Sequence, residues 1–428
     1  MTDTPVTTVF DNVRVLDTRT GTLGGPSQVV VQGQVIVRVG SDDHDRSDDL
    51  ESGPVRTIDG AGRVLMPGLI DAHWHAAFAT IPLEVLLRAD PGYVHLLAGR
   101  SATETLLRGF TSVRDAGGPT FGLKTAIDAG VLSGPRIFPS GAMISQTGGH
   151  GDFRSPADIP RGRLGHLSHA DLIGATAVAD GVDEVLRATR EQLMLGASQL
   201  KLMAGGGVAS FYDPLDVTQY TEAELHAAVE VAANWGTYVM VHAYTPRSVQ
   251  QAIRAGVRSI EHGQLLDEET VAMMAEHELW WSLQPFLDDE DAVPMTGANR
   301  AKQLQMITGT ETAYGLARKH GVKLAWGTDT LFDPRLATRQ GAQLTKLARW
   351  FSPAEVITMA TSTNADLLAL SGPRNPYPAG KLGVVESGAY ADLLVVDGDP
   401  LEDLDLLSRP EQALKVIMKD GQFAKNLL

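Results

Sequence analysis

Cysteine is absent from the 428 residues of this chain. Disulfides and thiolate metal ligands are therefore excluded, and any metal ion must be bound by histidine, aspartate, glutamate or a modified side chain. No apolar run comes near the roughly 20 residues that a membrane-spanning helix needs, and residues 1–10 contain neither a basic segment nor a long apolar stretch. We therefore expect a cytoplasmic protein outside the membrane, without a secretion signal.

Basic residues are outnumbered by acidic ones, with 36 Lys and Arg against 52 Asp and Glu and a net charge of −16. Nucleic-acid backbones are bound by basic faces, so we do not expect a nucleic-acid partner. A small anionic substrate is compatible with this charge, because a few arginines or metal ions can dominate the electrostatic field of a site.

Both ends of the chain contain short valine-rich runs that are broken by glycine, proline and aspartate, a pattern typical of β-strands. These ends could be two unrelated β-rich tails. We favour one small β-sandwich domain built from residues 1–66 and 371–428, because short strands with open edges need partners.

The middle of the chain, residues 67–370, alternates short apolar runs with helix-like stretches, and a glycine often closes the helix before the next run. Eight such units predict an α/β fold with a parallel (β/α)8 barrel of the TIM type. The expected strands are Leu69–His75, Thr111–Asp115, Arg136–Ser140, Gln199–Met203, Tyr238–His242, Ser259–Glu261, Trp280–Leu283 and Lys323–Trp326.

Polar residues stand at the ends of five of these strands, which is where the active sites of such barrels lie. They are His73, His75, Lys201, His242, His262 and Asp329. The spacing of two between His73 and His75 places both imidazoles on one face of a strand. Taken singly, each residue has an ordinary explanation, since a histidine on an apolar strand is usually a core residue and an aspartate after a strand is usually a helix N-cap. Together they indicate a metal site.

Lys201 is the most informative of these residues. A lysine in the apolar context QLKLMAGGG would be costly to bury as an ammonium, so the simplest interpretation is a side chain that reaches the barrel rim. Alternatively, burial and nearby cations lower its pKa, and the neutral amine takes up CO2 to form a carbamate. A carbamate can bridge two metal ions about 3.5–4 Å apart. The surrounding histidines and Asp329 favour this second interpretation.

The order H-x-H, Lys, His, His, Asp resembles the binuclear, carboxylated-lysine branch of the amidohydrolase superfamily. MPGLIDAHWH is similar to the first-strand signature of that superfamily, and GKLGVVESGAYADLLVVDGDP is similar to its C-terminal signature. Further segments, SGAMISQTGGHGD and WGTDT among them, resemble the Xaa-Pro dipeptidase branch, a relative of which hydrolyses ochratoxin A. The resemblance covers essentially the whole chain. It implies hydrolysis of dipeptides or N-acyl amino acids that releases the C-terminal amino acid.

The resemblance also implies a cofactor and its ligands. His73, His75 and Asp329 would hold the more buried of two divalent metal ions, His242 and His262 would hold the other, and carboxylated Lys201 would bridge both. Histidine and carboxylate ligands without a redox demand suit zinc best. Members of this family usually form oligomers, so we expect a homo-oligomer.

Roles in catalysis and substrate binding follow as hypotheses. Asp329 would take a proton from the attacking water and pass it to the leaving amine, and His150 would polarise the carbonyl. Tyr244 and Arg247 would bind the free carboxylate of the substrate, although Arg247 fits a solvent-facing position at the start of a helix equally well.

Other residues near the expected site have weaker assignments. Arg114 and Asp115 are expected to form a structural pair beneath the site. Phe153, Trp281 and Phe286 are equally compatible with an aromatic pocket and with the core.

Three alternatives compete with the amide hydrolase. A deaminase of this superfamily would need a downstream glutamate after the fifth-strand histidine, whereas His242 is followed by Ala-Tyr-Thr, and it would leave Lys201 without a role. An enzyme that hydrolyses an imidazolone ring would not need a bridging lysine either. A metal-free scaffold would have lost ligands, whereas all six positions are filled here.

Overall fold

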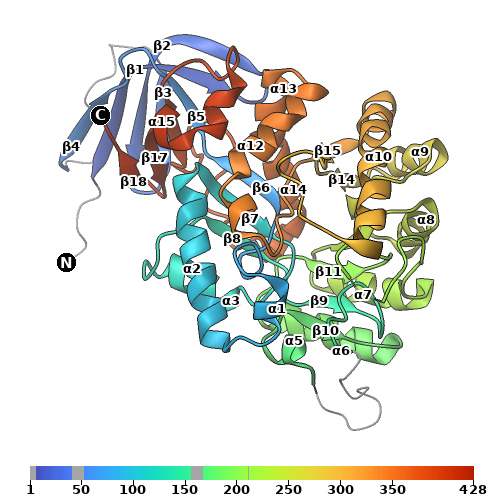
Figure 1. The fold of residues 1–428 in the computed structure, drawn as a ribbon. Helices are drawn as coiled ribbons and strands as arrows, with labels where there is room; N and C mark the ends of the chain where they lie inside the picture. The colour runs from blue at the N-terminus through green and yellow to red at the C-terminus, as the bar shows by residue number, and fades with distance from the viewer. Residues whose placement is uncertain (1–5, 41–52, 156–166, 211) are drawn as a thin grey trace.

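The computed structural model describes residues 6–40, 53–155, 167–210 and 212–428. Within these ranges, no helix combines the length and apolar character that crossing a bilayer requires. The chain forms parallel central strands surrounded by helices, and a separate sheet at one side of the molecule (Figure 1).

Each of the eight central segments expected from the sequence contains a strand. These strands are β6 (Leu69–Trp74), β7 (Phe110–Asp115), β8 (Arg136–Pro139), β11 (Leu200–Met203), β12 (Val239–Ala243), β13 (Ser259–His262), β14 (Trp280–Ser282) and β15 (Lys323–Ala325). Two further strands of three residues, β9 (Met143–Ser145) and β10 (Thr176–Val178), were not expected. Their brevity leaves too little apolar pattern to detect from sequence.

The central strands form two parallel sheets. One has the order β6-β7-β8 and the other the order β10-β9-β11-β12-β13-β14-β15. Backbone hydrogen bonds join both edges of the three-stranded sheet to the other sheet: the Ala72 amide donates to the Trp326 carbonyl at 3.1 Å, and the Ser198 amide donates to the Pro139 carbonyl at 2.7 Å. Because the strands are parallel, their C-terminal ends face the same way, which confirms the predicted α/β class with parallel strands.

Helices connect and cover the central strands (Figure 1). They are α1 (Leu83–Leu86), α2 (Pro91–Leu107), α3 (Phe121–Asp128), α5 (His169–Leu172), α6 (Val182–Met194), α7 (Glu222–Asn234), α8 (Pro246–Ala255), α9 (Glu268–Glu276), α10 (Gly297–His320), α11 (Pro334–Ala337), α12 (Gln340–Thr345), α13 (Pro353–Thr358) and α14 (Asn364–Leu368). Short helical turns are η1 (Lys346–Arg349), η2 (Met359–Thr363), η3 (Ala369–Arg374) and η4 (Leu404–Ser408), and α15 (Pro410–Ala413) follows the last of them.

Local sequence signals account for several helix boundaries. Thr221 and Glu224 form a reciprocal capping box at the start of α7. Gly256 and Gly321 end α8 and α10 in the left-handed conformation, with φ of 92° and 63°, where a side chain would be strained. The next central strand begins shortly after each glycine, as the sequence pattern predicts.

Strands from both ends of the chain pair in one eight-stranded sheet (Figure 1). Its order is β18-β17-β16-β5-β1-β2-β3, with β4 paired to β1. The strands are β1 (Thr7–Asp17), β2 (Thr22–Gln32), β3 (Val35–Gly40), β4 (Val55–Asp59), β5 (Val64–Pro67), β16 (Leu393–Val396), β17 (Leu414–Lys419) and β18 (Gln422–Asn426). Antiparallel pairing of β5 with β16, in the register Leu65 opposite Val395, joins the two ends.

Candidate metal centre and active-site cavity

His73 and His75 lie at the C-terminal end of β6, and both are buried, at 1% and 2% exposure. Nδ1 of His73 is 2.7 Å from Oε2 of Glu261, and Nδ1 of His75 is 2.9 Å from the carbonyl oxygen of Gly117. Each imidazole therefore has one nitrogen held by a protein oxygen and the other free to face the site.

His242 and His262 occupy the equivalent positions on β12 and β13. Nε2 of His242 is 3.0 Å from the carbonyl oxygen of Gly206, and Nδ1 of His262 is 2.8 Å from Oε1 of Gln284. The backbone of His262 has a φ of +73°, an uncommon value for a non-glycine residue that often marks a functional site.

The partners of these four histidines identify their tautomers. Each partner is a carbonyl or carboxylate oxygen that can only accept, so the ring nitrogen beside it must carry the proton. Burial lowers the pKa of His73 to about 3, that of His262 to about 4 and that of His242 well below its ordinary value. Neutral rings of this kind offer a lone pair from the second nitrogen, which is the form that binds metal ions.

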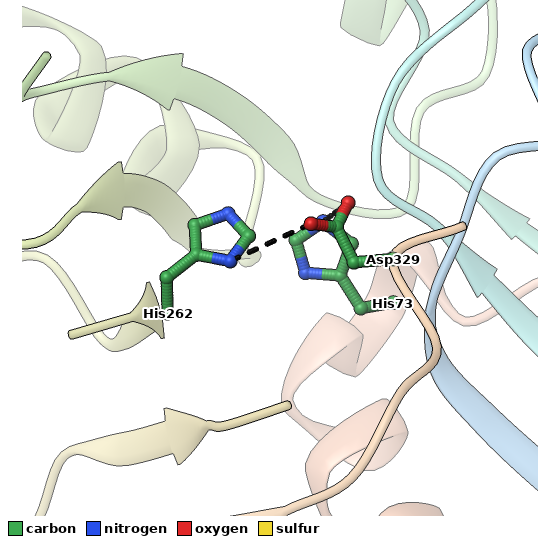
Figure 2. Close-up of side chains that lie close together, drawn as sticks. All are labelled: His73, His262 and Asp329. Carbon is green, nitrogen blue, oxygen red and sulfur yellow. Dashed lines mark ion pairs between the residues drawn. The ribbon is translucent and has the colours of Figure 1, made fainter. Parts of the chain in front are cut away.

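Asp329 lies among these rings just after β15 (Figure 2). Its Oδ1 is 3.3 Å from Nε2 of His73 and 3.4 Å from Nε2 of His75, and its Oδ2 is 3.7 Å from Nδ1 of His262. Burial favours the neutral acid, but the electrostatic interactions with His73 and His262 outweigh it and lower the pKa of Asp329. The ligand atoms of His73, His262 and Asp329 all lie within 4.8 Å of one another, a set of donors that suits a divalent cation.

Lys201 on β11 is buried beside these ligands, at 2% exposure. Its Nζ has no hydrogen-bond partner among the residues that the structure describes. Burial lowers its pKa to about 8, despite the opposing negative charges of Glu261 and Asp329. Burying an amine that has no hydrogen-bond partner costs free energy. The surroundings of Lys201 fit a carbamate that ligates metal.

Arg114 contacts Glu261, the partner of His73, and not the expected partner Asp115. Its guanidinium is fully buried, and Nη2 lies 2.9 Å from Oε1 and 2.7 Å from Oε2 of Glu261. The expected pair of Arg114 with Asp115 is wrong, because neighbouring residues on a strand point to opposite faces. Asp115 instead accepts hydrogen bonds from the amides of Ala76 and Gly117.

His150 and Tyr244 both reach the cavity above the histidines. The ring of His150 stacks on that of His242, with centroids 4.0 Å apart and planes at 19°, and its Nδ1 lies 2.8 Å from Oγ of Ser210. The ring of Tyr244 stacks on that of His262, with centroids 5.3 Å apart. Burial raises the pKa of Tyr244 well above its ordinary value, so its hydroxyl stays protonated.

Arg247 does not reach the site. It is exposed in the first turn of α8 and is not among the residues that line the cavity. The helix starts immediately after Thr245, so Arg247 belongs to its first turn and not to the strand end that carries His242. The structure therefore places Tyr244, but not Arg247, where a substrate could be held.

The cavity has a volume of about 1060 Å³, its open mouth included. Metal-site residues form its floor, and its walls are largely apolar. The wall residues include Met143, Met203, Val208, Phe286, Val293, Met295, Met306, Leu331 and Phe332. Phe286 lines the cavity as one of the expected aromatic positions, whereas Phe153 and Trp281 do not, and the indole N–H of Trp281 donates to the His262 carbonyl at 2.6 Å.

Several functional features of this site were not found from the sequence. Glu261, Gln284 and the carbonyl of Gly206 orient the histidines. Glu261 precedes His262 directly, so its position was visible, but its role required knowledge of which face each side chain occupies. The methionines of the wall carry no chemical signal in the sequence.

The amidohydrolase family model matches residues 64–423. The chain belongs to this family. Among curated relatives, this amidohydrolase is 32% identical to an ochratoxinase of Aspergillus niger over 419 residues, which span 93% of this chain and 82% of the relative.

Solved structures of related proteins agree with this assignment. A prolidase complexed with N-methylphosphonate-L-proline is 36% identical, covers 98% of this chain and 100% of its own, and has a TM-score of 0.88. A Xaa-Pro dipeptidase with bound methionine is 28% identical, covers 97% of this chain and 99% of its own, and has a TM-score of 0.82. The family and these relatives identify the protein as a hydrolase of amide bonds.

Proposed function

We propose that this amidohydrolase uses two divalent metal ions to hydrolyse dipeptides or N-acyl amino acids, releasing the C-terminal amino acid. The observation that carries the proposal is the convergence of four histidines, Asp329 and the amine of Lys201, which has no partner among the described residues, on one apolar cavity. The prolidase, Xaa-Pro dipeptidase and ochratoxinase relatives support this substrate class.

The proposed ligand sets follow the strands. His73, His75 and Asp329 would hold one ion, His242 and His262 the other, and a carbamate on Lys201 would ligate both. Zinc fits histidine nitrogen and carboxylate oxygen best. Divalent ions held there would supply Lewis acidity and a water-derived nucleophile near neutral pH.

The side chains of the protein would then position the substrate and move the proton. Asp329, an ionised carboxylate between the histidines, would accept the proton of the attacking water and deliver it to the leaving amine. His150 would orient the scissile carbonyl. The protonated hydroxyl of Tyr244 would donate a hydrogen bond to the free carboxylate of the substrate. Arg247 is left out of this proposal, because its side chain is exposed outside the cavity.

The apolar walls fit a bulky acyl group or amino-acid side chain. Ochratoxin A, an aryl amide of phenylalanine, belongs to this class, and the similarity to an ochratoxinase supports it as a substrate. Burying an aromatic side chain contributes roughly 1.5–3 kcal/mol, so we expect aromatic substrates to be favoured through KM.

The proposed architecture is a closed (β/α)8 barrel over residues 67–370 and a β-sandwich built from residues 1–66 and 371–428. The backbone hydrogen bonds at both sheet margins support the closed barrel. The shared sheet of β5 and β16 supports a domain made from both chain ends. Assembly into a homo-oligomer remains a prediction.

A panel of substrates tests the function. The protein is dialysed against zinc or manganese and incubated with an acyl-proline, acyl-phenylalanine dipeptides and ochratoxin A, while amino-acid release and metal content are measured. We expect two metal ions per chain and release of the C-terminal amino acid, both lost in Lys201→Ala. The exposed Lys319→Ala is the matched control. A protein that binds two metal ions but cleaves no member of the panel would refute the substrate class, and a metal-free protein would favour a scaffold.

A further inference from the structure

A second hollow lies on the surface away from the metal centre. Residues of α2 and of the C-terminal segment that contains α15 and β18 line it, and its volume is about 1810 Å³ including its open mouth. The ribbons of α2 and β18 lie beside each other in Figure 1. We call this hollow the α2–β18 groove. The charged residues that line it are Arg100, Glu104, Arg108, Arg409, Glu411 and Lys425. The chain has a net charge of −16, whereas these six residues include four basic and two acidic side chains, so the groove is locally positive.

Arg108 has unusual surroundings in this groove. The buried guanidiniums of Arg114 and Arg136 each meet a carboxylate, of Glu261 and Asp392 respectively. Arg108, which is half-buried, forms no ion pair with any residue that the structure describes; its Nε donates to Oε1 of Gln340 at 3.1 Å and its Nη2 to Oγ1 of Thr105 at 3.0 Å. Burial lowers the pKa of Arg108 to about 10, against the opposing effect of the carboxylates of Glu104 and Asp71, so the side chain remains cationic at neutral pH. Its remaining N–H groups, those of Nη1 included, are available to a ligand.

Lys425 reaches the same groove from β18. Its ammonium donates to the carbonyl oxygens of Pro410 and Glu411 at 3.1 and 3.0 Å, and it too forms no ion pair within the described part of the chain. Two of its three N–H groups are therefore occupied, and the third remains. Burial, together with the nearby charge of Lys415, lowers its pKa, although the negative charge of Glu411 opposes this.

The other charged residues of the groove are balanced locally. Arg100 pairs with Glu104 at 2.7 Å, and Arg409 pairs with Asp403 at 3.0 Å. Glu411 stands on the far wall from α2 and is exposed. Arg108 and Lys425 are therefore the cations of the groove that lack a direct ion pair among the described residues; Glu104 and Asp71 act on Arg108, and Glu411 acts on Lys425, only from a longer distance.

Arg108 is held in place by residues that lead to the metal centre. Gln340 accepts from Arg108 and donates to Oδ2 of Asp71 at 2.8 Å. Asp71 is fully buried and accepts from the amide of His73 at 3.0 Å. A guanidinium anchored in this way loses little freedom when it binds a ligand, which favours affinity.

From these contacts we propose that the α2–β18 groove binds a small oxyanion, a phosphate or a carboxylate group, through Arg108 and Lys425. A guanidinium at the end of α2 and an ammonium on β18, which both line the groove, suit the several oxygens of such a group. The groove does not share its lining with the active-site cavity, so the site is distinct from the one that would hold the substrate carboxylate.

Calorimetric titration of the full-length, metal-loaded protein with inorganic phosphate, and separately with succinate, tests the proposal. We expect saturable binding of at least one of them at low ionic strength, with one site per chain outside the metal centre. The anion that binds more tightly indicates whether the natural ligand carries a phosphate or a carboxylate group. Preferential binding of either one supports the proposed oxyanion site. Loss of one charge-assisted contact should weaken binding about tenfold or more, both in Arg108→Gln and in Lys425→Gln.

Arg187→Gln is the matched control, because it removes the same charge from an exposed pair on α6 and should leave binding unchanged. Lys425→Gln alters a residue near the surface, so it remains informative if Arg108→Gln fails to fold. No saturable binding, or binding that Lys425→Gln and Arg187→Gln affect equally, would overturn the proposal. So would binding that withstands both groove substitutions but disappears when the metal is removed. These results do not depend on hydrolysis, so they can be separated from a failure of the proposed function.

Discussion

The Nδ1–H of His73 donates to Oε2 of Glu261 over 2.7 Å, at a position where the guanidinium of Arg114 meets the same oxygen. All three side chains are buried. Burial alone would raise the pKa of Glu261, but the charge of Arg114 outweighs it and holds that pKa well below its ordinary value. A permanent carboxylate therefore orients the imidazole and presents the lone pair of Nε2 to the site.

Glu261→Gln tests this relationship. The substitution leaves the charge of Arg114 uncompensated in the core, so we expect the free energy of unfolding to fall by about 3–5 kcal/mol. Metal affinity should fall about 10- to 100-fold, as is usual when the partner of a metal-binding histidine is lost. Urea unfolding and titration against a chelator measure the two effects. The exposed Glu268→Gln should show neither, and an unchanged metal affinity in Glu261→Gln would contradict the positioning role.

Carboxylation of Lys201 predicts a dependence on CO2. Because the amine is buried without a partner among the described residues, we expect metal binding to the metal-free protein to be stronger with bicarbonate than in CO2-depleted buffer. Carbon-13 NMR with labelled bicarbonate should reveal one carbamate signal per chain. That signal should be missing from Lys201→Ala and present in Lys319→Ala. Full metal loading without CO2 would exclude the carbamate.

Because Gly207 lies against the ring of His150, we expect the substitution Gly207→Ala to reduce activity. A Cβ at Gly207 would collide with the ring of His150, which must then leave its stacked position on His242. Displacing a positioning group by about 1 Å can cost up to about 100-fold in rate, so we expect kcat/KM of Gly207→Ala to fall by at least about tenfold.

Gly315→Ala is the control for that substitution. Nothing lies within 4 Å of a Cβ at Gly315, which is inside α10. Replacing a helical glycine by alanine should raise the free energy of unfolding by about 0.5–1 kcal/mol and leave kcat/KM unchanged. Equal activities of the two variants would show that the His150 ring does not need its observed position.

Asp291 lines the cavity, and its lowered pKa leads us to expect that its contribution to stability depends on pH. Burial raises its pKa, but contacts with Arg339 and Lys346 outweigh this and lower the pKa below its ordinary value of 3.8. A carboxyl with a lowered pKa stabilises the fold fully above its ordinary pKa, and this contribution disappears as the pH falls through the lowered value. Asp291→Asn should therefore be less stable than the unaltered protein at pH 7, with the difference shrinking below about pH 4.

Urea midpoints at pH 7, 4 and 3 measure this difference. Asp288→Asn, at an exposed pair with Arg300, should show a much smaller effect at pH 7, because solvent screens exposed ion pairs. A difference for Asp291→Asn that is independent of pH would mean that packing, and not charge, explains the loss.

Much of the fold could be predicted because hydrophobic periodicity is local. The apolar runs that form β6 and β12 are visible without knowledge of their neighbours, and the histidines at their ends follow from strand order and the rule that barrel sites lie at the C-terminal ends. The three-residue strands β9 and β10 carry too short a pattern to be recognised.

The chemical identity of the candidate ligands was thus determined by the sequence, but their state was decided by the tertiary structure. Glu261 and Gln284 select the tautomers of His73 and His262, and these hydrogen bonds exist only once separate strands lie side by side. The exposed position of Arg247 likewise depends on where α8 begins relative to β12. The α2–β18 groove joins Arg108 and Lys425 from distant parts of the chain. No local pattern contains such pairings, because they arise from how the elements pack and not from the propensities of the residues within them.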